Sequence, residues 1–405
     1  MLSKPPRILL LATERWLTTA RLALALAPAG CEVQLMALRE HPAMLTGAVS
    51  AQYPYRPLSP IASLASAIDQ SKPDTVVPVD ELAVMHLIEL LGSAKGSPES
   101  EGLASLAERS LGRSPVLSAA VSRITLLAQA QAVGVAVPET VAVASLDGLE
   151  AAVAHFGYPL VLKADSTAGG RGVRIAKNFN EARAWWSRLH HPLSLPRSVW
   201  RCIKWKEWTH FRPWFKRQMR GVTAQRYLHG GERTAMAVAH QGEMQACVCF
   251  EVAQASKFCG PSTVLRVVDD PVMVAAMRAV LRRLGATGFC GFDFMLSDAG
   301  VPLLIEMNSR PTQLAHLSLG QGRDMVAAYV RSVLGRETPD RASATEGSLI
   351  ALYPQELVRD PQSRILAAAH HDVPWESPAL VRYALNPLPE TITKDARWKG
   401  REGKK

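Results

Sequence analysis

The chain has 405 residues, of which 48% are hydrophobic, and this size favours two or three domains with sizeable cores. Its apolar runs fall well short of the roughly 20 residues that a membrane-spanning helix needs, and its six cysteines form no CxxC pair, which argues against a disulfide framework or a zinc site. The net charge of +10 is concentrated in residues 188–220, which hold nine basic side chains and one acid. We therefore expect a soluble, cytoplasmic protein rather than a generally basic nucleic-acid binder.

The first part of the chain alternates strand-like and helix-like patterns. Strands and helices are predicted in turn at residues 7–12, 17–28, 32–36, 61–70, 75–78 and 82–92. This alternation favours a small parallel sheet covered by helices, which we place in residues 1–115. The turn at 12–16 contains no glycine, so the fingerprint of a dinucleotide-binding domain is absent.

A second region, which we place in residues 116–335, begins with a helix at 122–133 that ends before Gly134, a residue suited to a left-handed cap. Further elements are predicted at 160–163, 173–176, 224–228, 234–240, 245–252 and 271–284, followed by two strands that contain Asp293 and Ile305. Residues 336–346 have the composition of a linker and open a C-terminal extension, 336–405. The end of this extension, from residue 393, is expected to be disordered.

A lysine and a glycine-rich loop follow the apolar strand near residue 160. Lys163 is followed by Gly169, Gly170, Arg171 and Gly172. Glycine permits positive φ and close backbone approach, so amide groups can face phosphate oxygens while Lys163 adds a positive charge. The loop is not a Walker A motif, because no GxxxxGK[ST] sequence precedes a helix. Taken alone, a tight hairpin turn explains it equally well.

Oxygen ligands suited to a hard cation lie further along the chain. Strand alternation puts Glu306, Asn308 and Arg310 on one face. Asp293 lies on the neighbouring strand of a predicted hairpin, where it can face Glu306. Two converging carboxylates are costly unless a cation lies between them, and carboxylate and amide oxygens suit Mg²⁺. A solvated sheet edge is the alternative, but the glycine-rich loop upstream favours a site for magnesium and nucleotide phosphates.

Together these motifs resemble those of the ATP-grasp superfamily, within it the branch of biotin carboxylase and carbamoyl-phosphate synthase. The resemblance covers about residues 7–330. It implies an α/β fold class with an N-terminal parallel βαβ domain, called pre-ATP-grasp, followed by a two-lobed α+β ATP-grasp module.

The resemblance also implies roles for individual residues. The residues that match its ATP-binding positions are Arg123, Lys163, Gly169, Gly170, Arg171, Gly172, Gln225, Arg226, Tyr227, Leu228 and Glu232. Gln225 stands where glutamate is common in the family. Asp293, Glu306 and Asn308 match the magnesium ligands, and Arg310 matches the arginine beside the transferred phosphate. Lys257, on a loop with Ser262, would line the acceptor side, although a solvated charge explains Lys257 equally well.

The function that the resemblance implies is an ADP-forming carboxylate–amine ligase. ATP, with Mg²⁺ or Mn²⁺, would phosphorylate a small-molecule carboxylate, and a small-molecule amine would displace phosphate from the acyl phosphate. Two alternatives stay open: a bicarbonate-using carboxylase or carbamoyl-phosphate-type enzyme, and a non-catalytic ATP-binding protein associated with a membrane. A homodimer is one assembly to consider, and the sequence does not determine the oligomeric state.

A basic segment at 185–220 separates the glycine-rich loop from the predicted adenine hinge, and six of the nine tryptophans lie within it. We expect a lid first, a peripheral contact with an anionic membrane surface second, and nucleic acid last. His316 is interpreted as a structural residue, with a role as a base as the alternative. His370, His371 and Asp372 could suggest a metal site, but adjacent histidines on a short loop are more often surface residues, and we assign this region no chemistry.

Overall fold

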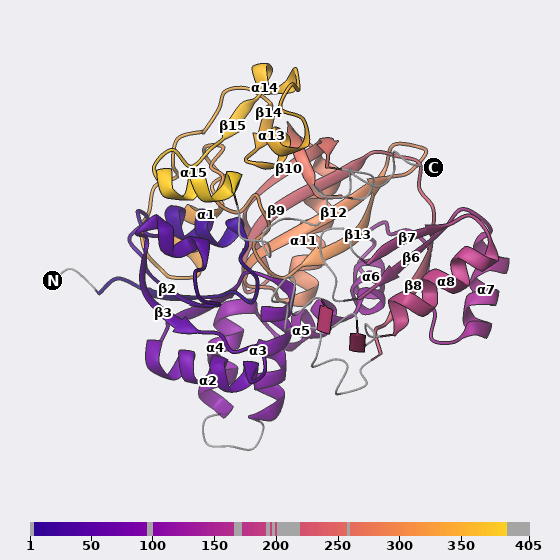
Figure 1. Ribbon diagram of the computed structural model, residues 1–405, viewed down its shortest axis with the longest axis horizontal. Helices are drawn as coiled ribbons and strands as arrows, with labels where there is room; N and C mark the ends of the chain where they lie inside the picture. The colour runs from indigo at the N-terminus through magenta and orange to yellow at the C-terminus, as the bar shows by residue number, and fades with distance from the viewer. Residues whose placement is uncertain are drawn as a thin grey trace.

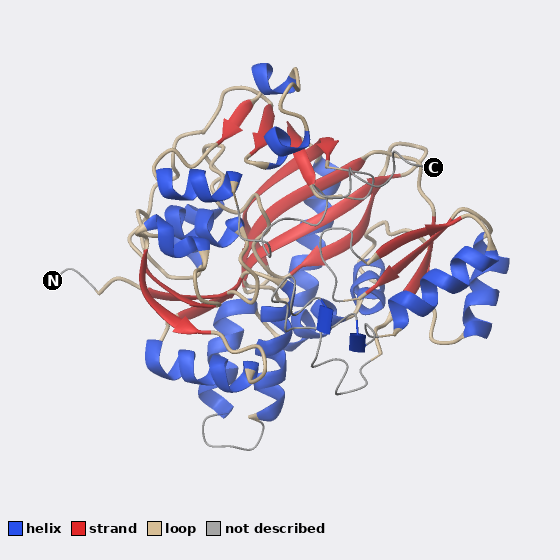
Figure 2. Cartoon of the chain, viewed as in Figure 1, coloured by secondary structure: helices blue, strands red, loops and turns tan. Residues whose placement is uncertain are grey.

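The computed structural model describes residues 4–94, 100–165, 172–191, 195–196, 199–200, 219–256 and 260–386. Three sheets organise these residues, and Figure 1 shows the seven-stranded sheet in the middle with the two smaller sheets on either side. Helices pack against all three sheets (Figure 2). Among the described residues, every helix is too short or too polar to cross a membrane.

The N-terminal sheet confirms the predicted parallel α/β region. Its strand order is β3-β2-β1-β4, and all its pairs are parallel. The strands are β1 (Arg7–Leu11), β2 (Glu32–Ala37), β3 (Val49–Pro54) and β4 (Thr75–Pro78). The accompanying helices are α1 (Leu17–Leu26), η1 (Pro42–Thr46), α2 (Pro60–Ser71), α3 (Glu81–Ser93), α4 (Ser100–Leu111) and α5 (Ser114–Val121). Strand β3 escaped prediction because it is an edge strand that alternates between exposed and half-buried residues.

The small lobe is a four-stranded sheet of order β5-β8-β6-β7. Its elements are β5 (Thr140–Ala142), α7 (Leu146–Phe156), β6 (Leu160–Ala164), β7 (Val173–Ala176), α8 (Phe179–His190) and β8 (Val222–Arg226). Helix α6 (Arg123–Gln131) precedes them and packs on the central sheet, because its Leu126 and Ala130 share a core with Phe292 and Leu304. Leu160, Leu162 and Ala224 pack on the helical face, which leaves Lys163 and Gln225 on the other face by strand alternation. Trp186 belongs to α8, and its Nε1 donates to the Val143 carbonyl at 3.1 Å, so the basic segment begins inside this lobe.

The central sheet has the order β13-β12-β9-β10-β11-β14-β15. Its strands are β9 (Glu232–His240), β10 (Glu243–Ala255), β11 (Ser262–Val268), β12 (Gly288–Leu296), β13 (Pro302–Asn308), β14 (Leu349–Leu352) and β15 (His370–Asp372). One face packs on α11 (Pro271–Leu284), and the other packs on α12 (Met325–Ser332) and on the N-terminal sheet with its helix α1. Helices α13 (Gln355–Arg359), α14 (Ile365–Ala368) and α15 (Pro378–Leu385) complete the C-terminal part. The division at residues 115 and 335 stays a prediction, since β14 and β15 extend this same sheet.

Residues 309–318 run across the strands of the central sheet after β13 ends. Thr312 covers Gly291 of β12, where an added Cβ would lie 2.3 Å from the threonine methyl group. Gln313 donates to Ser262 Oγ at the start of β11 at 2.6 Å, and His316 lies 2.9 Å from Asp372 of β15. This crossing segment therefore links one side of the sheet to the other.

Candidate active site

The antiparallel pairing of β12 and β13 sets Asp293 directly opposite Glu306. On its other side, Asp293 faces Thr234 of β9, whose hydroxyl donates to Asp293 Oδ1 at 2.9 Å. Burial, followed by the neighbouring Glu306 charge, raises the pKa of Asp293 to about 6. Each effect disfavours the ionised form, so a cation between the two carboxylates would remove the penalty.

Asn308 and Arg310 continue this polar face beyond the end of β13. Asn308 Nδ2 lies 3.5 Å from Asp293 Oδ2, and its Oδ1 accepts from Arg310 Nη2 at 3.1 Å. The described residues hold no group of three His, Cys, Asp or Glu side chains suited to a metal. Two carboxylates beside an amide nevertheless fit Mg²⁺, which takes few protein ligands and fills the remaining positions with water and phosphate oxygens.

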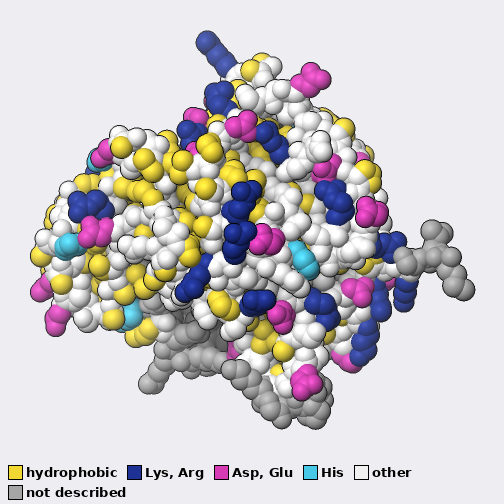
Figure 3. All heavy atoms as spheres, turned by 180° about the vertical axis from the view of Figure 1, so that it is seen from behind, with side chains coloured by type: hydrophobic (Ala, Val, Ile, Leu, Met, Phe, Trp, Pro, Cys, Tyr) yellow, Lys and Arg dark blue, Asp and Glu magenta, His cyan; other side chains and the backbone are white. Residues whose placement is uncertain are grey.

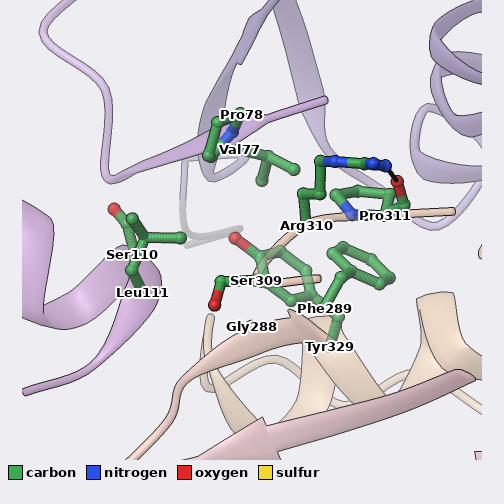
Figure 4. Close-up of a pocket in the computed structure, with 10 residues that line it drawn as sticks. All are labelled: Val77, Pro78, Ser110, Leu111, Gly288, Phe289, Ser309, Arg310, Pro311 and Tyr329. Carbon is green, nitrogen blue, oxygen red and sulfur yellow. Dashed lines mark hydrogen bonds between the residues drawn. The ribbon is translucent and has the colours of Figure 1, made fainter. Parts of the chain in front are cut away.

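Arg310 is anchored by the N-terminal region. Its Nε lies 3.2 Å from Glu81 Oε2, and its guanidinium carbon lies 5.4 Å from the centre of the Trp16 ring. Arg310 Nη1 also donates to the Pro311 carbonyl at 3.3 Å. Residues 309–311 line a small void of about 10 Å³ beside the stacked rings of Phe289 and Tyr329 (Figure 4). Burial raises the pKa of Glu81, and the Arg310 charge opposes that rise.

Arg123 joins the small lobe to the carboxylates of the central sheet. Its Nη1 lies 3.3 Å from Asp165 Oδ1, and its Nη2 lies 3.4 Å from Glu306 Oε2. Its Nε is buried and has no hydrogen-bond partner among the described residues. A buried guanidinium with a spare donor between two acids is suited to an additional anionic oxygen.

Lys163 and Gln225 lie on the face of the small lobe that does not carry the helices. Both side chains are buried, and Gln225 Nε2 has no hydrogen-bond partner within the described part of the chain. Burial raises the pKa of Glu232, and the charge of the nearby Lys163 ammonium opposes that rise. The facing surfaces of the small lobe and the central sheet, here called the cleft, thus bring Lys163 near Glu232 and Arg123 near Glu306.

The remaining predicted residues are placed unevenly. Gly172 is described, and its carbonyl accepts from the Ala164 amide at 2.9 Å. Arg226 is exposed and pairs with Glu139 at 3.2 Å, so only its backbone is available to the cleft. Tyr227 and Leu228 follow β8 in the connection to β9 and are half-buried. Gly169, Gly170, Arg171 and Lys257 lie outside the described residues.

The structure agrees with the interpretation of His316 and differs from the prediction for the region of His370 and His371. His316 is buried and contacts Asp372 and Arg21, which matches its structural interpretation. The region around His370 and His371 forms strand β15 and not the expected short loop; His371 is exposed, His370 is half-buried and Asp372 is buried. The reason is that β15 joins the central sheet, which brings Asp372 under α1.

Sequence reasoning missed four residues of the site: Trp16, Glu81, Asp165 and Thr234. A signal for two of them was present, because Trp16 and Glu81 lie after the carboxyl ends of parallel strands β1 and β4. Ligand sites in open parallel sheets form at that edge. Asp165 carried a weaker signal, since it directly follows Lys163 and Ala164. Thr234 carried none beyond its position on the strand beside Asp293.

Comparisons with known proteins agree with this geometry. A family model for the ATP-grasp domain matches residues 204–313, and one for the carbamoyl-phosphate synthase L chain ATP-binding domain matches residues 122–191. No match is found among curated proteins.

Solved structures share the fold at low sequence identity. The biotin carboxylase domain of Hydrogenobacter thermophilus 2-oxoglutarate carboxylase has 13% identity over 83% of this chain and 71% of that chain, with a TM-score of 0.58. N5-carboxyaminoimidazole ribonucleotide synthetase from Thermus thermophilus has 17% identity over 83% and 80%, with a TM-score of 0.55. L-amino acid ligase from Bacillus licheniformis has 14% identity over 85% and 78%, with a TM-score of 0.54. Two parts of the chain thus match family models for ATP-binding domains of the ATP-grasp type, and the fold is shared with these solved structures.

Proposed function

We propose that the protein is an ADP-forming ligase that joins a small-molecule carboxylate to an amine through an acyl phosphate. The observation that carries this proposal is the pairing of Asp293 with Glu306 and the contact of Arg123 with both Glu306 and Asp165, the residue two positions after Lys163. Such a cleft pairs a cation site with basic groups for phosphates, as phosphoryl transfer requires.

Asp293 and Glu306, with Asn308 beside them, would hold Mg²⁺. The bound cation would neutralise charge on the β- and γ-phosphates of ATP. Arg123 and Lys163 would bind the phosphate oxygens directly, and Glu232 of β9 would contact the ribose hydroxyls. The backbone of residues 225–228 would hold the adenine, since Arg226 turns its side chain away.

Arg310 would stabilise the negative charge that develops on the transferred phosphoryl group. Its contacts with Glu81 and Trp16 make the N-terminal region a wall of the acid and amine site. We infer that Glu81 holds the Arg310 guanidinium in place, because their ion pair is largely buried and its loss would leave that charge without its acidic partner.

The test is ADP release from Mg-ATP across a panel of carboxylates, each with and without amines. Release that needs both substrates supports the ligase. Release with bicarbonate would favour the carboxylase-type alternative, for which the H. thermophilus domain with bound bicarbonate is the reason to include that arm. Glu306→Gln should abolish release, whereas Glu243→Gln, at an exposed surface pair with Arg282, should not change it. Unchanged turnover by Glu306→Gln would refute the magnesium assignment.

Two finer properties of the proposal need their own measurements. Leu195, Val199, Trp200 and Met219 are exposed apolar residues within the basic segment, and they suit a peripheral contact with an anionic membrane. Elsewhere, on the face shown in Figure 3, basic and acidic side chains are interspersed. Protein that stays at the bottom of a flotation gradient with anionic liposomes would contradict the membrane contact. The homodimer, suggested by the dimeric H. thermophilus domain, is tested by analytical ultracentrifugation.

A further inference from the structure

A second hollow lies where the N-terminal region meets the C-terminal part of the chain. It has a volume of about 230 Å³ and is bounded by α1, the end of the crossing segment, the linker before β14, and the residues around β15. Leu24 and Leu317 provide part of an apolar wall, and Arg21, His316, Arg341 and Glu376 provide polar groups. Its size suits a small metabolite rather than a nucleotide.

This cavity is remote from the cleft that holds Asp293 and Glu306. His316 and Asp372 place it at β15, and five strand intervals of the central sheet separate β15 from β12. At about 4.8 Å for each interval, the separation is roughly 24 Å. A ligand here would therefore not reach the site of phosphoryl transfer.

Arg341 presents a fixed donor at this cavity. Its Nε and Nη2 donate to the two oxygens of the buried Asp324 carboxylate at 2.8 and 2.7 Å, and its backbone amide donates to the same group at 2.9 Å. Its Nη1 has no hydrogen-bond partner among the residues that the structure describes. The guanidinium is thus held rigid with one donor group unused, which suits a carboxylate oxygen.

Glu376 supplies the opposite charge at the same cavity. It is exposed and forms no ion pair or hydrogen bond within the described part of the chain. An unpaired carboxylate and an unused guanidinium donor that line the same cavity are complementary to a ligand that carries both charges. The apolar wall at Leu24 and Leu317 suits a hydrocarbon side chain on that ligand.

We propose that this cavity binds a small zwitterion, an α-amino acid with an apolar side chain, at a site separate from the nucleotide cleft. The ligand carboxylate would contact Arg341, its ammonium group would contact Glu376, and its side chain would lie on the apolar wall. The site goes beyond the ligase reaction, because it requires neither ATP nor the magnesium carboxylates.

The experiment is isothermal titration of the full chain with L-leucine, compared with 4-methylpentanoate and 3-methylbutylamine, which carry only the acid or only the amine. We expect saturable binding of leucine and at least tenfold weaker binding of either analogue. Glu376→Gln should weaken leucine binding at least tenfold. Glu346→Gln is the matched control, because it removes an exposed carboxylate from the neighbouring linker without touching the cavity.

Two outcomes overturn the proposal. The first is leucine binding that is absent from the wild type or equal in Glu376→Gln and Glu346→Gln. The second is loss of leucine binding in Glu306→Gln, since that result would place the amino acid in the ligase cleft. Retention of leucine binding by Glu306→Gln supports the separate site even if the ligase reaction fails its own test.

Discussion

Replacing Asp293 with asparagine should make the metal-free protein more stable while it removes the magnesium site. Burial and the facing Glu306 raise the pKa of Asp293 from 3.8 to about 6. At about 1.4 kcal/mol for each pH unit, this rise corresponds to about 3 kcal/mol of destabilisation at neutral pH. It is an upper bound, because Asp293 keeps some contact with solvent. Asparagine removes the charge and can still accept from Thr234 through its side-chain oxygen.

The pH dependence of the stability gain tests whether the raised pKa of Asp293 causes it. A carboxyl group whose pKa is higher in the folded state binds protons more tightly there, so its destabilisation grows as the pH rises from 3.8 to about 6 and is constant above that range. The stability gain of Asp293→Asn should therefore be about 3 kcal/mol at pH 8 and about 1 kcal/mol at pH 4.5. Urea unfolding in EDTA, followed by tryptophan fluorescence, measures both values.

Asp298→Asn is the matched control, because Asp298 is exposed in the turn of the same β12–β13 hairpin and its replacement should change neither value. Adding Mg²⁺ and ADP should stabilise the wild type more than Asp293→Asn. The reasoning is refuted if Asp293→Asn is no more stable than the wild type at pH 8, or if its gain is the same at both pH values.

Three further changes test other parts of the molecule. Glu81→Gln should lower the rate of ADP release at least tenfold with little change in ADP affinity, because it loosens Arg310 and leaves the nucleotide contacts intact; a changed affinity would contradict that role. Arg123→Met should weaken ADP binding at least tenfold, measured by fluorescence titration. Lys177→Met, which changes an exposed residue of the small lobe, should leave ADP binding unchanged. Gly112→Ala should lower the free energy of unfolding by more than about 2 kcal/mol, since Gly112 has a φ of +102° and an added Cβ would lie 2.2 Å from the Gly285 carbonyl. Gly134→Ala, with a φ of +78° and open space around it, should cost only about 1 kcal/mol, and equal losses in thermal unfolding would contradict the steric argument.

Much of the proposed cation site was predictable because a hairpin is specified locally. The alternation of Glu306 and Asn308 and the turn after β12 fix which residues face one another, so the approach of Asp293 to Glu306 follows from sequence. The α/β alternation of the first 92 residues likewise determines a parallel sheet. Boundaries shifted by a few residues, as with β8, which begins at Val222 rather than at residue 224.

Contacts between distant segments could not be predicted in the same way. Glu81 and Arg310 are 229 residues apart, and only the docking of the N-terminal sheet on the central sheet brings them together. Strands β14 and β15 have four and three residues, which are too few for a periodic pattern. Their place in the central sheet could therefore not be predicted from the sequence. The wall that faces Arg310 and the environment of Asp372 both depend on these long-range contacts.

The crossing segment explains why the two sites can be close in sequence and still behave separately. Arg310 belongs to the cleft and His316 to the second cavity, only six residues later. Between them, Thr312 is packed against Gly291, and Gln313 is hydrogen-bonded to Ser262. Thr312 is held against β12 and Gln313 against β11, so these two contacts oppose the transfer of a small displacement from His316 to Arg310. A ligand in the cavity should therefore change the stability of the protein more than the rate of its reaction.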